Sequence, residues 1–305
     1  MEKAPGTQPC LRALQGISSL SLHSILSRLA VERIEEKAAR IEETFTLSKG
    51  RWDDTLFRTL IRSAGFGIQS SIFQDWAGIL NMQALEKHRD SSLQIEAVMF
   101  GQAGLLNEES IPHYYRAGAL ASSYYKELLR EYKFLKNKFS LSELPYTAWG
   151  TASPHLRIAR LAALFFSRKL SISSISECGT ITALRRLFDA PLSAYWSNHL
   201  CFGGTETAGN GSMKSSQTDV LIINTVVPFL YLYGKHRKDE QLCSRAEDLL
   251  YGLASEENGI IRRWRERGIN ADCAAHSQAI IQLDKQYCRQ HRCAECLLGR
   301  YIIIE

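Results

Sequence analysis

The chain has 305 residues, of which 45% are hydrophobic, 23% charged and 10% aromatic. This composition excludes a disordered chain, a collagen-like repeat and a small domain held together by disulfides. The length is sufficient for one large or two ordinary domains. The formal net charge of +5 is too small to indicate nucleic-acid binding unless the basic residues gather in one place.

The N-terminal segment and the most apolar run both favour a cytoplasmic protein. Pro5, Gly6 and Pro9 stand where a signal peptide would need an apolar core. The most apolar run, Val220–Tyr233, has 14 residues, fewer than the roughly 20 that a helix needs to cross a bilayer. We therefore expect no membrane contact, and cysteines that are thiols or metal ligands rather than disulfides.

Helical periodicity dominates the first part of the chain. Residues 1–16 are predicted to form a linker, and the segments that follow carry apolar residues three or four apart. The last of these stripes has a spacing that predicts one helix of about six turns. The expected helices are Leu22–Phe45, Asp53–Ala64, Ile72–Leu80 and Leu120–Phe139.

A boundary between two helical halves is expected in the loop 140–153. Ser153 is a suitable N-cap and Pro154 a suitable first residue for a helix that continues to Leu170. The predicted halves are residues 17–145 and residues 153–305.

The glycine-rich stretch 201–216 is expected to be a mobile linker. It lacks the pattern of a phosphate-binding loop, although Lys214 and Ser215, close to a helix N-terminus, offer a weaker alternative as an anion site. Ser216 and Asp219 have the spacing of a capping box, which predicts a buried helix from Val220 that kinks near Pro228. Strands are the alternative for these apolar runs.

Three more helices are expected in the second half, over Asp239–Leu253, Ser255–Arg267 and about Asp272–Tyr287. The sequence therefore predicts an all-α protein of two packed multi-helix halves, closed by a short cysteine-rich knuckle.

The C-terminal knuckle is the candidate metal site. Three cysteines have the spacing C-x4-C-x2-C, and a histidine lies between the first two. This set would suit a tetrahedral zinc ion. His276 is excluded as the fourth ligand, because 12 residues of helix place it about 18 Å from Cys288. The simpler interpretation is three reduced cysteines without metal. The candidate ligands are Cys288, His291, Cys293 and Cys296.

The candidate nucleic-acid surface also lies in the second half. Residues 1–150 carry 18 Lys+Arg and 17 Asp+Glu, a net charge of +1, whereas residues 151–305 carry 19 and 15, a net of +4. Arginines that surround an aromatic residue, here Trp264, suit phosphate contact and base stacking. The alternative is a solvated helix face. The candidate arginines are Arg262, Arg263, Arg265, Arg267, Arg289 and Arg292.

No catalytic motif is recognisable in this chain. The patterns of serine hydrolases, zinc proteases and dinucleotide-binding domains are absent. His199 is the most pocket-like histidine, because it lies beside Tyr195, Trp196 and Asn198. A hydrogen-bonded core histidine is the simpler interpretation. We predict no catalytic residue within this chain.

Two resemblances accompany these patterns. The cysteine array is similar to an incomplete form of the iron–sulfur loop of helical DNA glycosylases, with a shorter first spacer and no fourth cysteine. These departures count against a cluster, and no other residue of those enzymes carries over. Several other strings resemble the bacterial domain-of-unknown-function family 2851: HRD at 88–90, FGQAGLL at 100–106, HLRIARLAAL at 155–164, IINTVVPFLYLYG at 222–234, ENGIIRRW at 257–264 and SQAIIQL at 277–283.

The family resemblance implies a role without catalysis. Members of that family begin with a further β-rich portion similar to restriction endonucleases, and the strings D-A-G-P-D-F and G-N-V-E-I-H of that portion are absent here. The expected function is therefore a non-catalytic helical module that contacts nucleic acid, as the accessory part of a nuclease-like protein. The alternative is a structural or protein-interaction domain without a ligand.

Overall fold

The computed structural model describes residues 17–67, 69–150, 153–207, 209, 211 and 213–304. Within these ranges the regular secondary structure is entirely helical, which confirms the predicted all-α class. The predicted linker 1–16 lies outside the described residues. In the same ranges, no helix combines the length and the apolar character needed to span a lipid bilayer.

The chain forms two compact units that divide it differently from the predicted halves. The first unit joins Met1–Glu42 to Val226–Glu305, and the second unit is the intervening Glu43–Thr225. The expected boundary loop 140–153 belongs to the second unit because it is fastened to that unit's own helices. Leu144 N donates to Gln102 O over 2.9 Å, and Trp149 Nε1 donates to Ala103 O over 2.7 Å.

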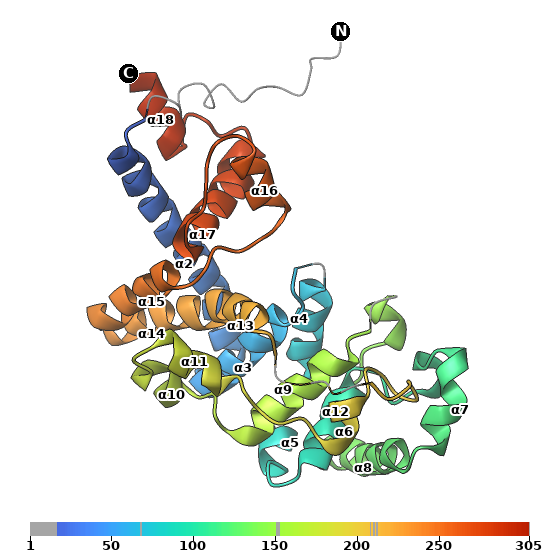
Figure 1. Ribbon diagram of the computed structural model, residues 1–305. Helices are drawn as coiled ribbons and strands as arrows, with labels where there is room; N and C mark the ends of the chain where they lie inside the picture. The colour runs from blue at the N-terminus through green and yellow to red at the C-terminus, as the bar shows by residue number, and fades with distance from the viewer. Residues whose placement is uncertain are drawn as a thin grey trace. The chain divides into compact units, whose positions relative to one another are not determined.

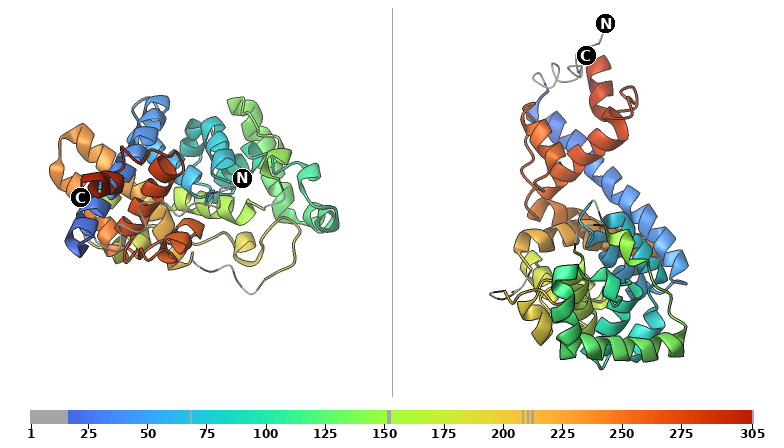
Figure 2. Two further views of the ribbon diagram at one scale, coloured as in Figure 1. Left: turned by 90° about the horizontal axis from the view of Figure 1, so that it is seen from above. Right: turned by 90° about the vertical axis from the view of Figure 1, so that its right-hand side faces the viewer.

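The first unit is built on the N-terminal part of one long helix and on the C-terminal helices (Figure 1). Its helices α14 and α15 pack against each other, and Asp239 caps α15 by accepting a hydrogen bond from Leu242 N. The helix α2 lies beside the C-terminal segment (Figure 2), where Tyr287 Oη donates to Glu32 Oε2 over 2.8 Å. The elements are α2 (Ser19–Leu47, which continues into the second unit), α14 (Val227–Arg237), α15 (Glu240–Gly252), α16 (Gly259–Arg265), α17 (Ala274–Gln282), the π-helix η4 (Leu283–Cys288) and α18 (Leu297–Ile304).

The second unit has its core around α6, which packs against both α8 and α9. Helix α6 is buried along most of its length, including Phe100 and Met99. The elements are α3 (Trp52–Ser63), α4 (Ser70–Ile79), α5 (Met82–Lys87), α6 (Ser92–Gln102), η1 (Glu108–Ser110), α7 (His113–Ala121), α8 (Ser123–Phe139), η2 (Tyr146–Trp149), α9 (His155–Ser167), α10 (Ile172–Glu177), α11 (Ile181–Leu187), α12 (Ala194–Asn198), α13 (Ser215–Leu221) and the π-helix η3 (Ile222–Val226), which reaches the unit boundary.

The long helix predicted over Leu120–Phe139 is two helices, α7 and α8. The chain breaks at Ser122, which is extended and whose hydroxyl accepts a hydrogen bond from Tyr125 N. Serine is a favoured N-cap because its side chain satisfies an otherwise unpaired N–H of the first turn. Leu120 and Tyr124 are four positions apart, so the apolar stripe continues across this break. The spacing alone therefore predicted a single helix.

The capping box predicted for Ser216 and Asp219 does not form. Helix α13 begins at Ser215, and Asp219 instead accepts two hydrogen bonds from Arg185, at 2.7 and 2.8 Å. The carboxylate is therefore used for a bidentate ion pair with α11, which is stronger than a local cap.

The distortion expected near Pro228 is a π-helical segment, η3, immediately before α14. Proline has no N–H, so in an α-helix the carbonyl of Asn224, four residues earlier, would lose its partner. Ser63 Oγ donates to that carbonyl over 3.3 Å, and Asn224 Nδ2 donates to Val220 O over 2.8 Å. The apolar run is helical rather than extended, as predicted.

Candidate functional site

The predicted arginine surface is centred on a buried carboxylate in the first unit. Asp284, at the start of η4, has a side chain only 7% exposed. Its Oδ2 lies 2.6 Å from Arg289 Nε and 3.6 Å from Arg263 Nη2, and its Oδ1 accepts a hydrogen bond from Trp264 Nε1 over 3.2 Å. Two predicted arginines from separate helical segments therefore converge on one acid.

The remaining candidate arginines are exposed on the same segments. Arg265 pairs with Glu257, and Arg292 pairs with Glu295. The Arg267 guanidinium lies 5.6 Å from the centre of the Trp264 ring. Arg262 has no carboxylate within ion-pair distance among the described residues. Trp264 itself is fully buried, so the predicted base-stacking role of this ring is not available from the surface.

The candidate metal ligands do not form a coordination set. In the described part of the chain, no group of three or more His, Cys, Asp or Glu side chains is arranged to hold a metal ion. Cys296 is buried and Cys293 and His291 are exposed. Burial raises the pKa of Cys296, and the backbone N–H groups of Gly299 and Leu298 oppose that increase. The zinc site at these residues stays a prediction.

A group of hydrogen-bonded polar side chains lies in the core of the second unit. Tyr124 Oη donates to Glu96 Oε2 over 2.6 Å, and Trp196 Nε1 donates to Tyr124 Oη over 2.7 Å. Burial raises the pKa of Glu96, although its hydrogen bond from Tyr124 works in the opposite direction. Burial and the Glu96 charge hold the pKa of Tyr124 well above its ordinary value. This chain of hydrogen bonds joins α6, α8 and α12.

Aromatic rings enclose that chain of hydrogen bonds. Trp196 stacks on Phe100 with ring centres 4.9 Å apart, and Phe202 contacts both rings. The stretch 201–216, predicted to be a mobile linker, is therefore anchored at Phe202, which is fully buried. His155 packs in the same cluster, where burial lowers its pKa to about 4 and keeps it neutral at pH 7.

His199, the histidine singled out from the sequence, ends α12 and stacks on Tyr195 with ring centres 4.0 Å apart. Its Nδ1 lies 2.9 Å from Tyr195 O. Lys214, the other weak candidate, is the exposed N-cap residue of α13.

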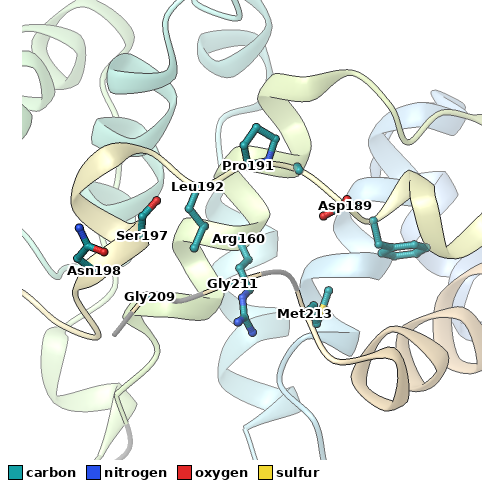
Figure 3. Close-up of a pocket in the computed structure, with 11 residues that line it drawn as sticks. Arg160, Asp189, Pro191, Leu192, Ser197, Asn198, Gly209, Gly211 and Met213 are labelled. Carbon is teal, nitrogen blue, oxygen red and sulfur yellow. The ribbon is translucent and has the colours of Figure 1, made fainter. Parts of the chain in front are cut away.

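Two of the helices that contribute to this hydrogen-bonded core also line a pocket of about 350 Å³, which Figure 3 draws in close-up. Helix α12 contributes Trp196 to the core and Asn198 to the pocket. Helix α9 contributes His155 to the core and Arg160 to the pocket. The other lining residues are Phe188, Asp189, Ala190, Pro191, Leu192, Ser197, Gly209, Gly211 and Met213.

Sequence reasoning missed this pocket because Arg160 is distant in the chain from the other lining residues. Arg160 lies within an ordinary amphipathic helix, and the nearest other lining residue, Phe188, is 28 positions later. Two signals were usable: Asn198, which lies beside the pocket-like His199, and a second arginine on α9, three positions after Arg157.

Comparison with known proteins places the chain in a family. Residues 1–259 match the family described as "Protein of unknown function (DUF2851)". The chain belongs to this family. No curated protein and no solved structure matches the chain.

The family match covers the pocket but not the candidate arginines and cysteines. It includes Arg160 and all the other lining residues of the pocket, and it ends before the first candidate arginine, Arg262. The matched DUF2851 region is thus the part that holds the pocket, whereas the candidate arginines and cysteines lie beyond it. The family description names no activity.

Proposed function

We propose that this DUF2851 protein is a non-catalytic helical module that contacts nucleic acid through the arginines of α16 and of the segment after η4. The observation that supports it most is the convergence of Arg263 and Arg289 on Asp284. One carboxylate balances only one of the two positive charges. Both guanidinium groups are also about half exposed, so each can reach a phosphate.

The charge of the surrounding segment supports the same proposal. Residues 259–300 carry eight Lys+Arg and four Asp+Glu, a net of +4, within a chain of net +5. The ion pairs Arg265–Glu257 and Arg292–Glu295 are exposed on both sides. Such solvent-exposed pairs contribute little to stability, so a phosphate can replace the acid at little cost.

In this proposal the module binds or positions nucleic acid, and any cutting would be done by a nuclease-like centre outside the described helices. Cys288, His291, Cys293 and Cys296 are not grouped around a common point in the described structure, so a zinc ion there would require these side chains to move together. If it bound, it would hold Arg289 and Arg292 in place. Elemental analysis of the purified protein tests that part, and less than about a tenth of an equivalent of zinc contradicts it. Absorbance near 400 nm would indicate an iron–sulfur cluster instead.

Salt-dependent binding tests the proposal. Fluorescence anisotropy with a labelled 20-base-pair DNA and the matching single-stranded RNA should show affinity that falls steeply with salt. The double variant Arg263→Gln/Arg265→Gln should weaken binding and reduce the slope of log K against log[salt] by about 2. The control is Arg130→Gln, an exposed arginine of α8 in the second unit. Undetectable binding at low salt, or an unchanged slope in the double variant, rejects the proposal.

A protein-interaction role is the second candidate. It is supported by large apolar side chains that α7 and α8 leave exposed: Tyr114 at 76%, Phe134 at 58% and Leu120 at 38%. Isolated exposed apolar residues are common, so this observation carries less than the charge distribution. If nucleic-acid binding is absent, this role becomes the preferred one.

A further inference from the structure

The pocket in the second unit contains an arginine with no partner. Among the described residues, no carboxylate lies within ion-pair distance of the Arg160 guanidinium, and its N–H groups donate a hydrogen bond to no oxygen. Its neighbour on α9 differs: Arg157 donates to Ala64 O and Gly65 O at 3.3 and 3.4 Å and stacks on Phe73. Arg157 therefore has a structural role, whereas the N–H groups of the Arg160 guanidinium are available to hydrogen-bond a ligand.

The surroundings of Arg160 favour the binding of an anionic partner to its guanidinium. The side chain is partly buried, and that burial lowers its pKa, as expected for a guanidinium partly withdrawn from water. The fork of N–H donors on arginine matches a carboxylate or phosphate in a bidentate geometry. An anion at this position would restore the hydrogen bonds that the guanidinium loses to burial.

The rest of the lining defines the ligand. Phe188, Leu192 and Met213 supply apolar surface, and the Asn198 side chain, which has no hydrogen bond within the described residues, supplies an amide. The volume of about 350 Å³ is within the usual range for small-molecule sites. The ligand should therefore combine one anionic group with an apolar body.

Asp189 limits the charge of the ligand. It lines the same pocket, and its charged end and that of Arg160 do not point toward one another (Figure 3). One positive and one negative side chain give the pocket no net charge, so a dianion would be repelled by Asp189. This favours a carboxylate, with a single charge, over a phosphate monoester.

We propose that the pocket binds a small organic monocarboxylate with an apolar body, held by the guanidinium of Arg160 and the amide of Asn198. The site is separate from the arginine surface of the first unit, so it does not depend on nucleic-acid binding. The hydrogen-bonded chain Glu96–Tyr124–Trp196 fixes α12 and with it the position of Asn198.

Isothermal titration calorimetry with 3-phenylpropionate tests the carboxylate site. We expect saturable binding with a Kd on the order of 1 mM or tighter. The neutral analogue 3-phenylpropan-1-ol and the dianion 2-phenylethyl phosphate should each bind at least about tenfold more weakly. No saturation at about 10 mM, or equal or tighter binding of either analogue, overturns the proposal.

Variants locate the site. Arg160→Gln should weaken 3-phenylpropionate binding at least about tenfold, while Arg130→Gln should leave it unchanged. Leu192→Trp retains both charges and should abolish binding by filling the pocket. The thermal unfolding of each variant is measured first. If Arg160→Gln does not fold, Arg160→Lys replaces it, and we expect this variant to retain part of the affinity. Undiminished binding in either Arg160→Gln or Leu192→Trp contradicts the assignment.

Discussion

Lys37 Nζ donates a hydrogen bond of 2.5 Å to Gln278 Oε1, and both side chains are buried in the first unit, between α2 and α17. Gln278 in turn donates to Glu256. Burial and, secondarily, the nearby Arg33 lower the pKa of Lys37 to about 7. A lysine that is half neutral at physiological pH is thus a source of instability in this unit.

Replacing this lysine should stabilise the protein. Lys37→Met removes the desolvation cost but leaves Gln278 Oε1 without its donor, so we expect a net gain of about 1–3 kcal/mol in the free energy of unfolding at pH 6–7. The unfolded chain binds the lysine proton more tightly than the folded chain between about pH 7 and pH 10.5. Wild-type stability should therefore rise with pH across this window.

Urea denaturation at several pH values measures this effect. The advantage of Lys37→Met should be largest below pH 7 and should shrink as the pH rises above 7. The control is Lys133→Met, an exposed lysine of α8. A variant that is less stable than the wild type at pH 6 would show that the Lys37–Gln278 hydrogen bond outweighs the cost of burying the amine.

Glu96 should give the opposite pH dependence in the second unit. Its pKa is raised by burial, so the folded chain favours the protonated acid. The contribution of Glu96 to stability is therefore fully present below the pKa of an unfolded glutamate, and is lost as the pH rises through the folded pKa. Gln at this position retains an acceptor for Tyr124 Oη and cannot ionise.

Glu96→Gln should therefore gain stability relative to the wild type as the pH is raised from 4 to 8. Thermal unfolding across that range measures the difference, with Glu109→Gln, an exposed residue of η1, as the control. A difference that does not change with pH would mean that Glu96 titrates normally in the folded chain.

A pair of helical glycines separates packing from backbone effects. A Cβ on Gly101 would lie 2.2 Å from the ring of Tyr132, which is buried against α6. A Cβ on Gly78 of α4 would have no neighbour within 4 Å among the described atoms. We expect Gly101→Ala to lose about 1–3 kcal/mol of unfolding free energy and Gly78→Ala to gain up to about 1 kcal/mol.

Urea titrations of both glycine variants give this comparison directly. A neutral Gly101→Ala variant would show that Tyr132 can move aside without cost, and thus that the contact between α6 and α8 is loosely packed.

The sequence was informative wherever local spacing decided the structure. The apolar stripe of α2 and the extent of α15 follow from residues within one or two turns. Helix α15, predicted over Asp239–Leu253, runs over Glu240–Gly252. Ser122 was missed because the apolar stripe continues across it. Asp219 was misassigned because its actual partner, Arg185, is 34 positions away.

Long-range partners limited the prediction of the site in the same way. The six arginines were found from their clustering in the sequence, around Trp264 and near the cysteines. The carboxylate between Arg263 and Arg289 could not be assigned, because Asp284 resembles any other acid on a helix. The partnerless state of Arg160 is likewise a property of the fold. A sequence reveals which residues are charged, and only packing determines which charges remain unpaired.

Asp284 gives the sharpest test of the arginine surface, because stability and binding should change in opposite directions. Asp284→Asn removes the charge that Arg263 and Arg289 share and weakens the hydrogen bond from Trp264. The free energy of unfolding should fall by about 1–3 kcal/mol. Nucleic-acid affinity should rise instead, because the two guanidinium groups lose their competing anion and the local net charge increases by one. Both quantities are measured on one preparation, by urea denaturation and by anisotropy at low salt. An affinity that falls with stability would show that Asp284 merely supports the fold and that the arginines around it do not contact phosphate.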